Sequence, residues 1–174
     1  MKLNKFSILF AAICGLFMAA AAFPQGSTFS DLNVDYTFDL PEAAWKMVAK
    51  PSATNPNVEY VYGDRRDGHL EVRKISVTKT DVLSELIRTE ENRLQFLPGY
   101  VAGKEEQFAG HLKGMAFNFE FVRAGLNMSG RYYFLRANDT TVYVLRFSGL
   151  QNKLKSIRNQ TDSIARTFEI KKVN

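Results

Sequence analysis

Hydrophobic side chains alternate with polar or small ones along several segments, which is the pattern of half-buried β-strands. The clearest run holds Met115, Phe117, Phe119 and Phe121 at every second position. Short links such as 124–127 separate neighbouring runs, so consecutive strands are expected to pair in antiparallel fashion. Strands are predicted over 36–40, 58–63, 70–78, 100–108, 112–123, 128–136 and 141–148.

Two further segments have the period of an amphipathic helix. In the first, over 80–97, Thr80 or Asp81 is placed to cap the first turn, and a proline–glycine pair follows the last. The second, over 150–168, has apolar residues at intervals of three and four. Two helices and an antiparallel sheet of about six strands predict an α+β fold. Because both faces of 141–148 are apolar, the helices are expected to cover opposite faces of the sheet.

The first residues have a different pattern. Lys2 and Lys5 precede an uncharged apolar run over 8–23, which ends in small residues. This layout is typical of a secretory signal peptide, here 1–22, with cleavage after Ala22. The alternative is an uncleaved anchor, but the run falls slightly short of the about 20 apolar residues that span a bilayer.

Removal of this signal defines the mature chain. A lipoprotein signal is not expected, because Ile13 rather than a small residue precedes Cys14, the only cysteine. Loss of two lysines lowers the formal charge from +5 to +3, and loss of Cys14 excludes disulfides and thiol chemistry. The prediction is a secreted or periplasmic protein of a bacterial envelope, with an extended segment over 23–35 and a single domain over 36–171.

The segment 36–47, "YTFDLPEAAWKM", joins an aromatic strand to the only tryptophan. Pro41 cannot donate to a strand ladder, so the strand is expected to end there. Trp45 is then expected to fold back onto the sheet together with Met47. The aromatic side chains assigned to the core are Tyr36, Phe38, Trp45, Phe117, Phe119, Phe121, Phe147 and Phe168.

This opening segment resembles the first motif of the PsbP-like and DcrB-like domain family. The segments "FAGHLKGMAFNFEF" (108–121) and "SIARTFEI" (163–170) are similar to the family's central strands and closing helix. The resemblance covers about residues 29–170 and implies an α/β/α sandwich with an antiparallel sheet. It implies binding of other proteins rather than catalysis. Photosynthetic members are associated with calcium and manganese, but none of their functional residues matches this chain, so no site is carried over.

No catalytic motif supports an enzyme. The chain lacks a nucleophile elbow, a phosphate-binding loop and a dinucleotide-binding glycine motif. The two histidines, His69 and His111, each lie beside a glycine near a predicted turn. His69 and Glu71 could face the same way on a strand, but a metal site needs at least a third ligand. No catalytic residue, metal ligand or cofactor is therefore assigned, and a hydrolase or metalloenzyme using either histidine is the last alternative.

The predicted function is binding of another envelope protein. Arg65, Arg66 and His69, in a hairpin turn expected over 64–69, are the predicted contact residues, together with the loop 50–57. A carrier of a small apolar or lipid-like ligand, held between sheet and helix, is the alternative. Nucleic acid is not expected as a partner, because acidic residues alternate with the basic ones. Weak association with an anionic membrane surface stays open, and the sequence does not determine the oligomeric state.

Overall fold

The computed structural model describes residues 26–171. The predicted signal peptide therefore lies outside the described residues. Ten strands and three helices follow one another along the described chain. Their bounds are β1 Ser27–Ser30, β2 Tyr36–Leu40, β3 Trp45–Ala49, β4 Val58–Tyr62, β5 Asp64–Ser76, α1 Leu83–Leu94, β6 Val101–Ala109, β7 Lys113–Arg123, β8 Leu126–Asn138, β9 Thr141–Leu150, α2 Gln151–Ser156, α3 Arg158–Thr167 and β10 Glu169–Ile170.

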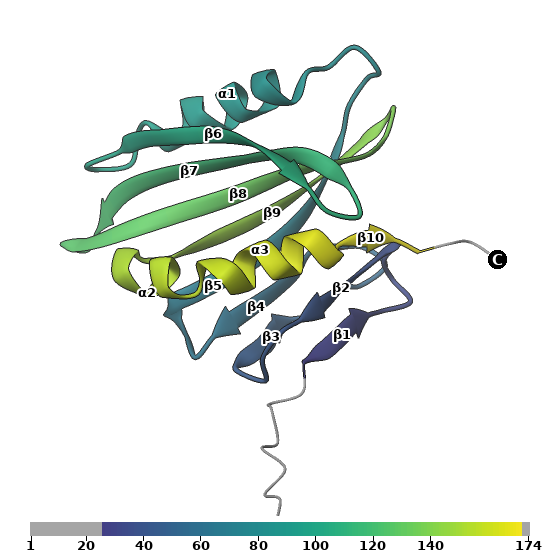
Figure 1. Ribbon diagram of the computed structural model, residues 1–174, viewed down its shortest axis with the longest axis horizontal. Helices are drawn as coiled ribbons and strands as arrows, with labels where there is room; N and C mark the ends of the chain where they lie inside the picture. The colour runs from purple at the N-terminus through teal and green to yellow at the C-terminus, as the bar shows by residue number, and fades with distance from the viewer. Residues whose placement is uncertain (1–25, 172–174) are drawn as a thin grey trace, which may run out of the picture.

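Seven strands form an antiparallel sheet in the order β3-β4-β5-β9-β8-β7-β6, and β1, β2 and β10 form a small second sheet. In Figure 1, α1 (teal) lies on one side of the large sheet, whereas α2 and α3 (yellow) and the small sheet lie on the other. The predicted α+β class and the predicted α/β/α layering are therefore confirmed. The large sheet has seven strands rather than about six, because Trp45–Ala49 adds an edge strand that its composition did not indicate.

Two separate cores occupy the two faces of the sheet. Ile87 and Leu94 of α1 pack against Phe117, Phe119 and Phe121 of β7 on one face. The core on the other face joins α2 and α3 to β5, β8, β9 and the small sheet. The structure buries all eight aromatic side chains that the sequence assigns to the core: Tyr36, Phe38, Trp45, Phe117, Phe119, Phe121, Phe147 and Phe168.

Both helices differ from their predicted bounds. The helix expected over 80–97 runs from Leu83 to Leu94, and the carboxylate of Asp81 instead accepts a hydrogen bond from the Thr78 backbone in the preceding turn. The helix expected over 150–168 is two helices, which meet at Ile157. The Ile157 side chain is buried, so tertiary packing fixes the break that the continuous apolar stripe conceals.

The segment 36–47 passes between the two sheets. Tyr36 and Phe38 belong to the small sheet, and Trp45 begins the edge strand of the large one. Trp45 is buried, as expected, but Met47 is 41% exposed and is not part of the core cluster that contains Trp45. The expected extended segment 23–35 includes β1, which pairs with β2, so the folded unit begins before residue 36.

The hairpin between β4 and β5 turns earlier than predicted. The chain reverses at Gly63, whose φ of 68° favours glycine, and Tyr62 pairs with Asp64. The turn expected over 64–69 is instead part of β5. Residues 65–68 have no partner on β4, because the register shifts beyond Val61.

Candidate functional site

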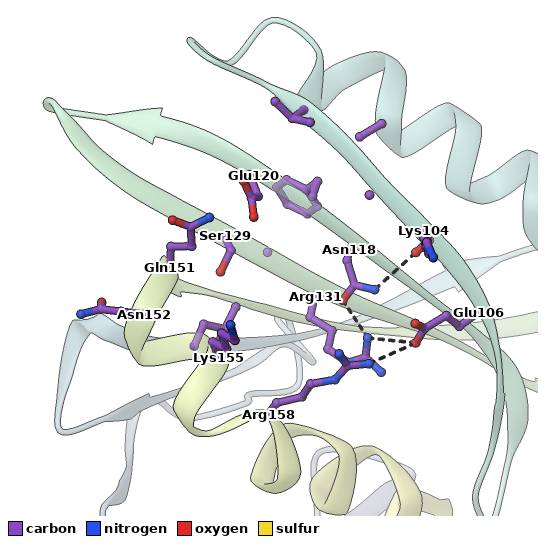
Figure 2. Close-up of a pocket in the computed structure, with 16 residues that line it drawn as sticks. Lys104, Glu106, Asn118, Glu120, Ser129, Arg131, Gln151, Asn152, Lys155 and Arg158 are labelled. Carbon is purple, nitrogen blue, oxygen red and sulfur yellow. Dashed lines mark hydrogen bonds and ion pairs between the residues drawn. The ribbon is translucent and has the colours of Figure 1, made fainter.

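A groove of about 830 Å³ lies between helix α2 and the sheet strands β6, β7 and β8. It exists because α2 and α3 cover β5, β9, part of β8 and the hairpin end of β6 and β7, but leave the other end of β6 and β7 open. The alternation of apolar and polar side chains along β7 agrees with this arrangement. Its phenylalanines face α1, whereas Asn118 and Glu120 face the groove. Figure 2 shows polar side chains from the sheet and from α2 on either side of this open strip.

A β-bulge shapes the wall that β6 contributes. Ala102 pairs with Phe119 and Glu105 pairs with Phe117, so residues 103 and 104 together oppose Asn118. A side chain at Gly103 would lie 2.4 Å from the Asn118 carbonyl oxygen, which explains the glycine. The Asn118 amide donates to the Lys104 carbonyl at 3.3 Å and so supports the bulge. Bulges redirect side chains, and this one places Lys104 on the groove wall.

The buried guanidinium of Arg131 lies beneath the groove. Its side chain is 8% exposed. The guanidinium donates to Asn118 Oδ1 at 2.7 Å and to Asp162 Oδ1 at 3.0 and 3.1 Å. It also stacks on the Tyr133 ring, 4.9 Å from the centroid. A buried charge is tolerated only when it is paired in this way, so Asp162 of α3 fixes Arg131 of β8.

Further contacts extend this network from the sheet to the helices. Glu106 lies 3.4 Å from Arg131 Nη1 and 3.3 Å from Arg158 Nη2. The Tyr133 hydroxyl contacts both Thr161 and Asp162. Burial raises the pKa of Tyr133 far above its ordinary value, so the phenol stays neutral. Burial opposes the charge on Arg131, but the contacts with Tyr133 and Asp162 outweigh it, and its pKa is raised.

The groove is amphipathic and carries more positive than negative side chains. Its lining includes the basic residues Lys104, Arg131, Lys155 and Arg158 and the acidic residues Glu106 and Glu120. Val101 and Leu154 add apolar surface beside them. This arrangement is suited to binding, since it offers charges, amides and a hydroxyl to a ligand. Neither histidine lies in the groove lining, and within residues 26–171 no cluster of three or more possible ligands is placed to hold a metal ion.

The sequence-predicted contact residues lie elsewhere. Arg65, Arg66 and His69 lie on β5 rather than in a turn, because the chain has already reversed at residue 63. Arg65 and His69 both contact Glu59 Oε2 at 2.8 Å, whereas the Arg66 side chain is exposed. The predicted loop 50–57 precedes β4 and this cluster follows it, so the structure places them at opposite ends of that strand.

The pairing of His69 with Glu71 that the sequence allows is not formed. His69 contacts Glu59 rather than Glu71, and its side chain is only 15% exposed. Glu71 instead lies 2.7 Å from Arg73 and 3.7 Å from Arg146. The carboxylates of Glu59 and Glu71 therefore each pair with basic side chains of the protein.

The groove and its network do not follow from any local pattern in the sequence. Arg131, Asp162 and Glu106 come from three elements, and no local pattern relates them. One signal was available, since Asn118 and Glu120 alternate with buried phenylalanines and so indicate a polar second face on a central strand.

Comparison with known proteins supports the fold. No family model matches the chain, and no curated protein matches it by sequence. Solved structures do match. LpqN of Mycobacterium tuberculosis, involved in cell envelope biogenesis, has a TM-score of 0.57 and 16% identity over 85% of this chain and 91% of LpqN. The Ran-binding protein Mog1p of Saccharomyces cerevisiae has a TM-score of 0.61 and 12% identity over 84% of this chain and 96% of Mog1p.

The cyanobacterial PsbP protein of Synechocystis sp. PCC 6803 has a TM-score of 0.55 and 15% identity over 87% of this chain and 95% of that protein. Together these similarities show that the chain has the PsbP-like fold, as the sequence resemblance implied. Identities this low establish the fold alone. Within residues 26–171, no helix is both long and apolar enough to cross a membrane.

Proposed function

We propose that this protein is an exported, non-enzymatic PsbP-like domain that binds a protein partner in the cell envelope, and that the groove beside α2 is the contact site. The observation that carries the proposal is the groove itself. It is an open, amphipathic depression whose Arg131 floor is held by buried ion pairs. Such preorganisation reduces the ordering that binding requires.

Two similarities support the proposal. Mog1p is a Ran-binding protein, so a protein with this fold binds another protein. LpqN is involved in cell envelope biogenesis, which agrees with the compartment that the predicted signal peptide indicates. The groove differs from the surface around Arg65, Arg66 and His69 that the sequence favours. We prefer the groove because Arg65 and His69 are already engaged by Glu59.

A carrier of a small apolar or lipid-like ligand is the second candidate. The exposed surface of the groove lining is more apolar than polar, with Val101 and Leu154 among its apolar residues, which favours a carrier. Nine of the sixteen lining residues carry a charge or an amide, however, and these suit a polypeptide better than an alkyl chain. Native mass spectrometry of the purified protein separates the two, because a carrier would retain a ligand of defined mass.

Site-specific photo-crosslinking in the producing cell tests the proposal. A photoreactive residue replaces Asn152 on the groove wall, or Leu32, which is fully exposed and lies outside the groove lining. We expect a discrete protein adduct from position 152 and none from position 32. Arg66 provides a third position on the sequence-predicted surface. Adducts from position 66 without any from position 152 would refute the groove as the contact site.

A further inference from the structure

The charged and polar side chains of the groove indicate which kind of partner segment it binds. We infer that it recognises an extended, acidic segment of the partner protein, whose carboxylates pair with Lys104 and Lys155 and replace Glu106 at Arg158. The inference rests on the proposed function and adds the chemical class of the bound segment.

Two unpaired ammonium groups lie on facing walls of the groove. Lys104 comes from the β6 bulge and Lys155 from α2, and Figure 2 shows them on either side of the open strip. Both residues are exposed, and within residues 26–171 neither has an ion-pair partner. Arg131 and Arg158 are already paired with Asp162 and Glu106. Among the described residues the lining therefore has two unpaired lysines and one unpaired carboxylate, Glu120, and is complementary to an acidic ligand.

Glu106 already occupies the position beside Arg158 that a carboxylate of the partner would take. Its contacts with Arg131 and Arg158 are long, at 3.4 and 3.3 Å, and its side chain is 40% exposed. Its pair with Arg158, whose side chain is 52% exposed, is open to solvent on both sides, and exposed pairs contribute little to stability. When Glu106 moves away, the buried Arg131 remains paired with Asp162 at 3.0 Å. A carboxylate from the partner can therefore pair with Arg158 without leaving a buried charge unpaired.

The shape of the site favours a polypeptide over a lipid surface. The basic residues lie around a depression rather than on a convex face, so a flat bilayer would not reach the groove floor. Asn118, Ser129 and Gln151 place amides and a hydroxyl along the same strip. These groups suit the backbone of an extended chain, which presents donors and acceptors along its length.

The experiment is an NMR titration of the ¹⁵N-labelled mature protein with a capped peptide of alternating glutamate and alanine. We expect shifts of the Lys104, Asn118 and Lys155 amide signals, and a dissociation constant that rises with salt. The glutamine version of the peptide should not bind. The double variant Lys104→Glu/Lys155→Glu should bind the acidic peptide about tenfold more weakly.

The matched control is Lys46→Glu/Lys113→Glu, which makes the same charge change at exposed positions away from the groove lining. This variant should bind the peptide as the parent does. Equal weakening by both double variants, or equal binding of the glutamine peptide, would overturn the inference. Groove shifts produced by anionic phospholipid vesicles but not by the peptide would overturn it as well. If crosslinks from position 152 persist while the acidic peptide fails, the proposed function stands and this inference alone is wrong.

Discussion

Replacing Trp45 with alanine should destabilise the protein by about 3–5 kcal/mol. The indole is 4% exposed and packs against the rings of Tyr62 and Phe147, at centroid distances of 5.4 and 5.9 Å. A buried aromatic side chain removes about 150–250 Å² from water, which at about 25 cal/mol per Å² corresponds to about 4–6 kcal/mol. Residual compactness of the unfolded chain lowers that value into the expected range.

The indole nitrogen adds a separate, smaller contribution. It donates to Gln160 Oε1 at 2.9 Å, so Trp45 links the edge strand β3 to α3. Trp45→Phe keeps an aromatic ring but loses this hydrogen bond, and should cost about 1–2 kcal/mol. The ordering of the two variants separates packing from hydrogen bonding.

Urea unfolding followed by far-UV circular dichroism measures these differences. Fluorescence does not serve for the variants, because Trp45 is the only tryptophan. Leu32→Ala is the control, since its side chain is fully exposed, and it should change stability by less than about 0.5 kcal/mol. A loss below about 1 kcal/mol for Trp45→Ala would refute the core assignment. Full stability combined with loss of the crosslinked adduct would instead make Trp45 a contact residue.

Three further predictions concern the groove and the ion pairs. Arg131→Met should cost about 3–5 kcal/mol in urea unfolding, because it leaves Asp162 without its cation; a loss below about 1 kcal/mol would contradict this. Gly103→Ala should displace the bulge and shift the NMR signals around Asn118, since its Cβ would meet the Asn118 carbonyl at 2.4 Å; an unchanged spectrum would disprove the steric argument. Burial opposes ionisation of Glu59, but its two hydrogen-bond donors outweigh burial and lower its pKa. Its stabilisation should therefore be complete above its ordinary pKa of about 4.3 and disappear as the pH falls through the lowered folded-state pKa. Glu59→Gln should flatten the decline of the unfolding free energy below about pH 4, and an unchanged decline would argue against this pair.

The groove owes its position to the way the two helical layers divide the sheet. One layer, α1, packs on the phenylalanines of β7, and the other packs on β5, β8 and β9. On the face opposite α1, α3 covers the hairpin end of β6 and β7, where Phe108 and Ala116 are buried. Among the described residues no helix covers the other end of these two strands, where the groove lies. Polar residues on that face, such as Asn118 and Glu120, are what such an uncovered face requires.

The sequence by itself determined the elements whose signals are local. The alternation around Phe117 predicts β7, and the intervals of three and four predict helical structure up to Phe168. Apolar residues on both faces of 141–148 correctly predicted helices on opposite faces of the sheet. These inferences succeed because strand and helix periods are properties of a few consecutive residues.

Only the tertiary structure decided the remaining features. The sequence predicts the hairpin turn over 64–69, but the chain reverses at Gly63. The break at Ile157 interrupts a stripe that is continuous in sequence, because packing against the sheet fixes that residue. The groove joins Arg131 to Asp162, 31 residues further along the chain. Contacts at such separations depend on how the layers pack, so no local pattern of residues predicts them.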